Sequence, residues 1–172
     1  SGMAGPLISG PAVNHDAYSN EYILGILRSC KTIAMVGSSS HWNRPSFFAM
    51  KYLQEKGFRI IPVNPTAAGQ EILGEKVYAG LRDIPDRVDM VDCFRNAAAI
   101  PPIAGDAIAI GAKVLWMQLG VRNDAAAEQA EKAGLKVVMN RCPKIEYGRL
   151  SGEIAWMGVN TRVISSKRQR KV

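Results

Sequence analysis

The sequence predicts an α/β protein with a doubly wound, five-stranded parallel sheet of order 3-2-1-4-5 and helices on both faces. Two observations lead to this prediction. Short apolar runs rich in β-branched residues alternate with helical stretches, which is typical of consecutive βαβ units. A small-residue loop, Gly37 to Ser40, follows the first run and leads into a helix. Because such crossovers are right-handed, we expect a ligand crevice at the carboxyl ends of strands 1 and 4, where the order reverses.

The first half of the chain shows clear start and stop signals. Apolar residues recur at helical spacing from Ser19 to Arg28, and Ser19 is a suitable N-cap. The run 32–36 is the first buried strand. Pro45 suits the first position of the next helix, where its missing N–H costs nothing, and Gly57 ends that helix.

The second half repeats the pattern. Asn123 or Asp124 is the expected N-cap of one of its helices, and Gly134 its end. The predicted elements are a second strand at 58–63, irregular chain at 66–80, a third strand at 88–94, a helix at 100–111, a fourth strand at 113–117, a helix ending at Gly134 and a fifth strand at 135–139.

We expect one domain, residues 19–150, between two less regular ends. Residues 1–18 are predicted to be a flexible N-terminal segment, and residues 151–172 an extended C-terminal segment. The last eight residues, 165–172, carry four cations and no acid. Such a basic tail is typical of solvated chain, with contact to a nucleic acid or a membrane surface as the alternative.

Composition favours a folded protein of the cytoplasm. The 172 residues are 47% hydrophobic and carry a net charge of +7. No apolar run approaches the roughly 20 residues that cross a bilayer, and no signal-peptide pattern is visible. Three scattered cysteines form neither a disulfide framework nor a zinc site, which favours a reducing compartment.

The residues at the predicted strand ends are polar but not acidic. The carboxyl ends of parallel strands meet at one edge of a sheet, so these residues are expected to gather there. Amides, hydroxyls and guanidinium groups suit a ligand with several phosphates. They are Gly37, Ser38, Ser39, Ser40, His41, Asn43 and Arg44 after strand 1, Asn64 and Pro65 after strand 2, Phe94, Arg95 and Asn96 after strand 3, Gln118, Gly120 and Arg122 after strand 4, and Asn140, Arg141 and Cys142 after strand 5.

The same residues argue against two common nucleotide sites. A dinucleotide fingerprint needs G-x-G-x-x-G and an acid after strand 2, whereas Gly37 is followed by serines and strand 2 ends at Asn64. No G-x-x-x-x-G-K-[ST] loop is present either.

Several separated motifs, taken together, resemble the small stand-alone CoA-binding proteins, which are similar to the N-terminal domain of the succinyl-CoA ligase alpha subunit. The resemblance covers roughly residues 20–150 and implies a Rossmann-like fold that holds coenzyme A. The motifs are Val36-Gly-Ser38 with Arg44-Pro45, Val63-Asn-Pro65, Val88-Asp-Met-Val-Asp92 with Phe94-Arg95, Trp116-Met-Gln-Leu-Gly120 and Asn140-Arg-Cys-Pro-Lys-Ile-Glu146.

The resemblance also implies residue roles. Phosphates would contact Gly37, Ser38, Ser39 and Arg44. The nucleotide would lie against Asn64 and Pro65, and the adenine between Phe94, Arg95 and Ile100. Gln118 and Gly120 would lie towards the pantetheine. Ser40 and Pro45 complete the predicted binding set as parts of the loop and helix start, where a helix N-terminus favours an anion.

We therefore expect a binding module for CoA or an acyl-CoA without catalysis of its own. One alternative is a nucleotide-dependent enzyme, an NAD(P) oxidoreductase or a CoA transferase-like protein, that uses the same crevice. Another is a regulatory or scaffolding protein whose basic tail meets a protein partner, with CoA as the signal. A homo-oligomer is also open, whereas a membrane or nucleic acid is not the expected partner.

Four side chains leave their roles open. His41 contacts phosphate or solvent in preference to acid–base work, because no carboxylate is placed to orient it. Cys142 is either packed at a strand end or a reactive thiol near cations. Trp42 and Trp116 either stack on adenine or pack in the core.

Overall fold

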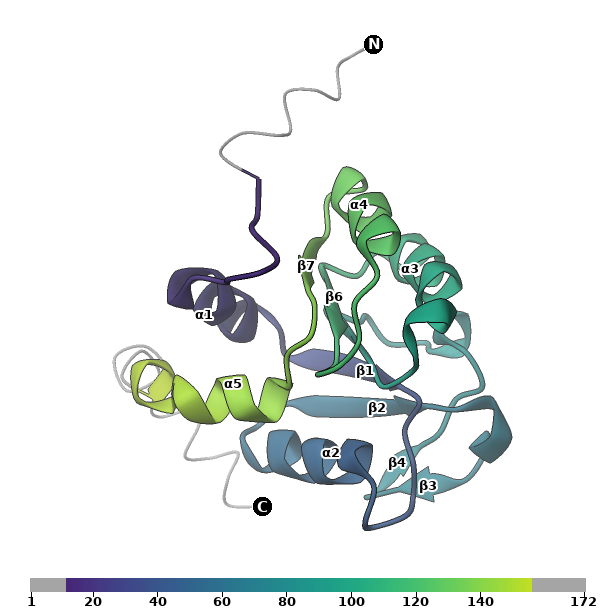
Figure 1. The fold of residues 1–172 in the computed structure, drawn as a ribbon. Helices are drawn as coiled ribbons and strands as arrows, with labels where there is room; N and C mark the ends of the chain where they lie inside the picture. Colours follow the sequence, from purple (N-terminus) through teal and green to yellow (C-terminus); the bar gives the residue numbers. More distant parts are fainter. Residues whose placement is uncertain (1–11, 156–172) are drawn as a thin grey trace.

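The computed structural model describes residues 12–155, which form a parallel sheet with helices on both faces (Figure 1). The predicted α/β, doubly wound fold class is confirmed. The strands lie in the order β2-β1-β5-β6-β7, and their bounds are β1 (Thr32–Val36), β2 (Arg59–Val63), β5 (Met90–Cys93), β6 (Val114–Met117) and β7 (Lys136–Val138).

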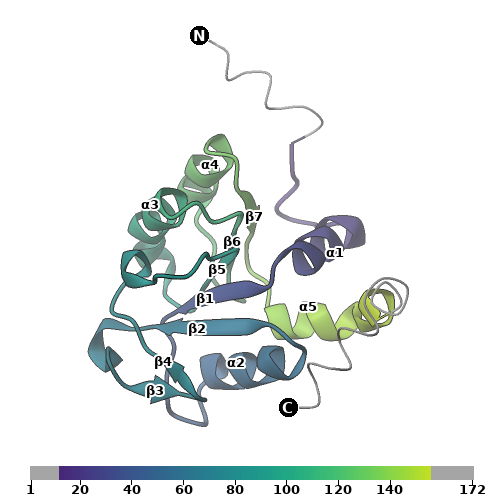
Figure 2. The same ribbon diagram turned by 180° about the vertical axis from the view of Figure 1, so that it is seen from behind.

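The helices divide between the two faces of the sheet, as Figure 2 shows from behind. One face carries α1 (Asn20–Ser29), α2 (Pro45–Glu55) and α5 (Pro143–Arg149), and the other carries α3 (Ile100–Ala109) and α4 (Asp124–Lys132). Because both faces are covered, β5 and β6 are buried along their whole length and their sequences are nearly continuous apolar runs.

The predicted helix starts are confirmed by their caps. The Ser19 hydroxyl accepts a hydrogen bond from the Tyr22 amide (3.1 Å), and the Asn123 side chain accepts one from the Ala126 amide (2.9 Å). Pro45 is the first residue of α2.

None of the helices between residues 12 and 155 is long and apolar enough to cross a lipid bilayer.

The strand order corrects the prediction in one respect. Numbered along the chain, the five strands read 2-1-3-4-5 across the sheet, because the third strand, β5, pairs with β1 and not with β2. The chain between β2 and β5 buries Leu81 and Val88 in the same core cluster as α3 and α4. It therefore crosses on the face opposite α2, where a right-handed crossover brings β5 to the open side of β1. The order reverses between β1 and β5.

Residues 66–80, expected to be irregular, contain a small antiparallel hairpin. Its strands are β3 (Glu71–Ile72) and β4 (Glu75–Lys76). Tyr78 then bridges to Val63, so this segment runs beside the outer edge of β2. Short 3-10 turns complete the connections: η2 (Pro65–Ala67), η3 (Leu81–Asp83) and η4 (Ala97–Ala99).

The N-terminal segment, predicted to be flexible over residues 1–18, is anchored from His15 onward. The His15 ring lies 2.7 Å from the Tyr18 hydroxyl and 3.0 Å from a carboxylate oxygen of Glu131 in α4. The Tyr18 hydroxyl accepts from the Met139 amide (2.8 Å), and the Tyr22 hydroxyl bonds both the N–H and the C=O of Val137. Two tyrosines thus hold the outer edge of β7.

The C-terminal part corrects another prediction. Residues 151–155, expected to be extended, are helical and continue beyond α5, which spans residues 143–149. Leu150, between these stretches, is buried against the core on the α1 and α2 face, and this packing stabilises a helix too short to stand alone. The basic tail lies in residues 156–172, which together with residues 1–11 lie outside the described residues.

Asp92 in β5 places a carboxylic acid at the centre of the core. The residue is fully buried, and neither carboxyl oxygen has a hydrogen-bond partner in the described part of the chain. Burial raises the pKa of Asp92 well above its usual range, because an ionised carboxylate there would lose its hydration without compensation. The fold therefore favours the protonated form.

Replacing Asp92 by Asn is expected to stabilise the protein more strongly as the pH rises. The unfolded chain releases this proton at about pH 3.9, whereas the folded chain keeps it. The free energy of unfolding is therefore not reduced by Asp92 below that pH. Above it, the value falls by about 1.4 kcal/mol per pH unit until the pKa of Asp92 in the folded protein is passed. The amide of Asp92→Asn does not titrate. Urea unfolding of both proteins between about pH 5 and pH 8 measures the difference. A constant difference over that range would contradict the prediction.

Candidate functional site

A pocket of about 710 Å³ opens at the carboxyl ends of β1, β2, β5 and β6. Its walls come from the loops that follow these strands and from the first turn of α2. None of the residues that line it is Asp or Glu. The pocket lies across the point between β1 and β5 where the strand order reverses, which is the usual ligand position in open α/β sheets.

The pocket brings most of the predicted binding residues together. Those that line it are Gly37, Ser38, Ser39, Ser40, Arg44, Pro45, Asn64, Phe94, Arg95 and Gln118. Pro65 and Gly120 lie next to lining residues in the chain but do not line the pocket. Ile100, which the resemblance places beside the adenine, is the first residue of α3, is fully buried in the core, and does not line the pocket.

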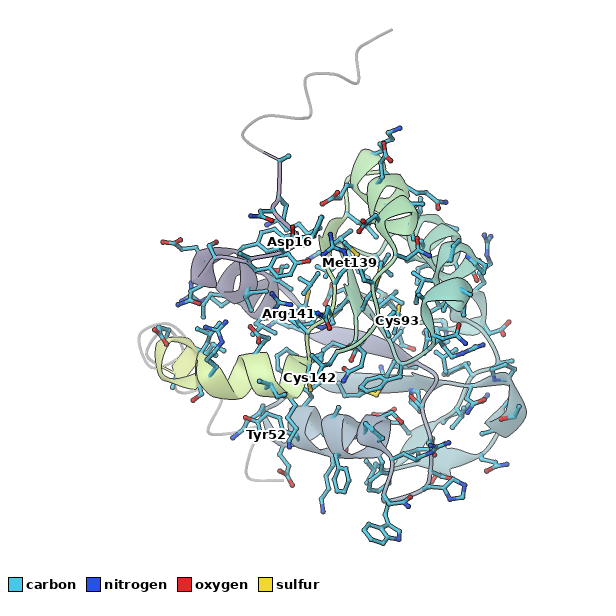
Figure 3. The ribbon with its side chains drawn as sticks, viewed as in Figure 1. Asp16, Tyr52, Cys93, Met139, Arg141 and Cys142 are labelled. Atoms are coloured by element: carbon cyan, nitrogen blue, oxygen red, sulfur yellow. The ribbon has the colours of Figure 1, made fainter. Side chains whose placement is uncertain are left out.

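The loop after β7 is also outside the pocket, because β7 is the strand of the sheet farthest from β2. Figure 3 shows Arg141 and Cys142 between β7 and the start of α5. The Arg141 guanidinium lies 5.0 Å from the centre of the Tyr18 ring. Asn140 accepts a hydrogen bond from the Gly120 amide (2.7 Å), so this loop supports the neighbouring loop after β6.

Several residues that line the pocket were not predicted from the sequence. Some come from the connection after β2, which was expected to be irregular, and others neighbour predicted residues. Leu119 could have been predicted because it follows the fourth strand, and Ser46 because it follows Pro45 at the start of α2. The full set is Ser46, Thr66, Ala67, Gln70, Leu119 and Val121.

Gly37 allows the loop after β1 to pass against the end of β5. Its φ is +88°, a conformation that glycine adopts without strain. A Cβ at this position would collide with the carbonyl oxygen of Phe94 and lie 3.1 Å from Cδ of Arg95. The glycine therefore serves close packing of two strand ends.

Internal hydrogen bonds hold this loop. The Gly37 and Ser38 amides donate to the Val63 carbonyl (2.9 and 3.4 Å), and the Ser39 amide donates to the Ser46 hydroxyl (3.1 Å). The Asn64 amide group donates to the Ser38 carbonyl (2.7 Å). The backbone N–H groups of Gly37, Ser38 and Ser39, three residues expected to contact phosphates, therefore already have partners. A ligand would therefore meet the side chains of this loop and not these three amides.

Two arginines supply positive charge at the pocket. Arg44 is the N-cap residue of α2, and Arg95 follows β5. Both line the pocket, are exposed, and take part in none of the ion pairs found in residues 12–155. His41 lies on the same wall. The positive end of the α2 dipole adds to this field, so the pocket favours anions.

The sequence matches the family described as "CoA binding domain" over residues 31–148. The chain belongs to this CoA-binding domain family.

Relatives of this CoA-binding domain include small proteins and segments of larger enzymes. The "Uncharacterized protein YneT" of Bacillus subtilis is 36% identical over 129 residues, which cover 75% of this chain and 94% of that protein. The "Acetate--CoA ligase [ADP-forming] I subunit alpha" of Pyrococcus furiosus is 30% identical over 122 residues, which cover 63% of this chain but only 26% of the subunit.

Solved structures support the same fold. A "hypothetical protein from Pyrococcus horikoshii OT3" superposes with a TM-score of 0.75 at 38% identity, covering 83% of this chain and 99% of the other. A crystal structure described as "Prb (PH1109 protein redesigned for binding)" gives 0.76 at 41% identity, covering 83% and 96%.

Two tryptophans and a glutamate of the CoA-binding domain, whose roles the sequence left open or did not address, do not line the pocket. Trp116 is fully buried, and its indole N–H donates to the Arg141 carbonyl (2.9 Å), so its role is core packing. Trp42, after β1, is 72% exposed and does not line the pocket. Glu146 is buried, and its carboxylate accepts a hydrogen bond from the Arg149 guanidinium (2.6 Å).

Replacing Gly37 by Ala is expected to destabilise the protein by about 1–3 kcal/mol or more, because the positive φ and the contact with Phe94 both oppose a Cβ. Gly25, inside α1, is the matched control, because a Cβ added there would meet no heavy atom within 4 Å. Gly25→Ala should be neutral or stabilising, since Ala favours a helix. Urea unfolding compares the variants, and equal stability of the two would contradict the role given to Gly37.

Proposed function

We propose that the protein binds coenzyme A or an acyl-CoA in the pocket at the ends of β1, β2, β5 and β6, without catalysis of its own. The observation that carries this proposal is the acid-free lining with two arginines that have no ion-pair partner in residues 12–155. Coenzyme A carries a diphosphate and a 3′-phosphate, and guanidinium groups bind phosphate through paired hydrogen bonds.

Different parts of the pocket lining suit different parts of coenzyme A. Arg44 caps α2, where a helix N-terminus favours the diphosphate, and Ser39 and Ser40 line the pocket from the loop that leads to this helix. Phe94 and Arg95 offer an apolar face and a planar cation for the adenine ring. Gln118 and Leu119, on the other side, suit the amides and methylenes of pantetheine.

The name of the Pyrococcus furiosus relative includes CoA, and its match to this chain supports CoA over other anions. The chain spans only a quarter of that subunit, so the ligase reaction itself is not carried over. Binding alone is the simpler proposal, because no carboxylate lines the pocket to orient His41 as an acid or base. Such a protein would act where CoA is made and used, in the cytoplasm.

A ligand panel tests this proposal. CoA and acetyl-CoA should raise the melting temperature by about 5–10 °C at roughly 100 times the dissociation constant, because a ligand that binds only the folded state stabilises it. NAD, NADP and ATP should have little effect. A shift with NAD or NADP but none with CoA would instead favour the oxidoreductase alternative. The measurement is a thermal shift with each ligand at matched concentration.

Replacing Arg44 by Ala should weaken CoA and dephospho-CoA equally, by about 10- to 100-fold, if this side chain bonds the diphosphate as its place beside α2 favours. Arg28→Ala removes the same charge from an exposed position in the last turn of α1 and is the control. Isothermal titration calorimetry gives both affinities. A larger loss for CoA would place Arg44 on the 3′-phosphate, and no loss would remove it from the site.

A further inference from the structure

Asp92 and Gln118 lie on the same face of the sheet, on neighbouring strands. Side chains alternate between faces along a strand. Met90 and Trp116 pack in the core on the face of α1 and α2. Asp92 is two residues after Met90, and Gln118 is two residues after Trp116, so both belong to that face. The backbone N–H of Gln118 donates to the Cys93 carbonyl (3.2 Å), which continues the hydrogen-bond ladder between β5 and β6.

Both side chains have unused hydrogen-bonding capacity. The carboxyl oxygens of Asp92 and the side-chain oxygen of Gln118 are buried without a partner in the described residues. Unpaired buried polar atoms are costly and rare in native proteins. Three such atoms, in two residues on adjacent strands and one face, therefore call for a common explanation.

The sheet neighbours of Asp92, all within residues 12–155, offer no other partner. The register places Asp92 between Met35 of β1 and Trp116 of β6. Met35 has no strong donor or acceptor, and the indole N–H of Trp116 is already bonded to the Arg141 carbonyl. The fully buried residues that pack over this face are hydrophobic. Gln118 is the neighbour left, because two residues along the next strand correspond to about 8 Å between Cα atoms, within reach of the two side chains together.

We propose that Asp92 is a positioning residue for Gln118: its protonated carboxyl donates to the Gln118 side-chain oxygen and turns the two N–H donors of the amide into the pocket. A neutral carboxyl has one O–H to donate, and an amide oxygen accepts it. Rotation of the Gln118 side chain makes this bond, which pairs the Gln118 oxygen with one of the two Asp92 oxygens. The amide nitrogen then faces the space that Gln118 already lines.

This arrangement selects a ligand with a carbonyl oxygen. Two fixed N–H groups bind a neutral carbonyl, such as an amide of pantetheine or the thioester of an acyl-CoA. The inference rests on the proposed binding of CoA and assigns Asp92 to the end of the site that holds the pantetheine arm. The affinity for a ligand that lacks this arm should not depend on Asp92.

The test compares Asp92→Leu with Asp92→Asn, using CoA and adenosine 3′,5′-bisphosphate, which lacks the pantetheine arm. Asp92→Leu removes the donor and should weaken CoA about three- to tenfold, without changing the affinity for the bisphosphate. Asp92→Asn keeps an N–H donor and should retain the affinity for CoA. Calorimetry on the full chain gives all four constants.

A purely structural Asp92 would give a different result. Equal weakening of both ligands by Asp92→Leu, or equal loss of CoA affinity in both variants, would overturn the inference. Gln118→Met provides a second route if Asp92→Leu fails to fold: it should reproduce the loss for CoA alone, and unchanged CoA affinity would also overturn the inference. If the unmodified protein binds no CoA, the proposed function itself fails.

Discussion

The close approach of β1 and β5 is the contact on which the site depends. These strands pair in parallel from Ile33 to Val36, and Gly37 then turns away directly against the Phe94 carbonyl. Without a side chain at residue 37, the serine loop after β1 and Arg95 after β5 share one wall of the pocket. Because the strand order reverses here, the two loops diverge above this contact and leave the pocket between them.

The residues around this contact divide into supports and binding groups. Ser46 and Asn64 use their side chains to hold the loop after β1. Arg44 and Arg95 remain available at the rim. A rigid loop with available cations is preorganised, so less conformational entropy is lost when an anion binds. The polar residues at these strand ends therefore include two whose side chains hold the loop itself.

Local signals explain what the sequence could predict. The caps at Ser19 and Asn123 act within one helix turn, and strand ends locate polar loops whatever the order of the strands. The order itself depends on which face Leu81 and Val88 pack against, which is a tertiary property. The burial of Ile100 was not predicted for the same reason, since packing of α3 on the sheet decides where its apolar side chain points.

The tyrosines beside β7 have a consequence for the whole molecule. An unprotected edge strand offers unpaired N–H and C=O groups to strands of other molecules. The hydroxyls of Tyr18 and Tyr22 occupy such groups at Val137 and Met139. Tyr18, just before α1, and Tyr22, inside it, thus protect this edge from self-association. Shortening the chain past residue 22 would leave the edge open to intermolecular sheet extension.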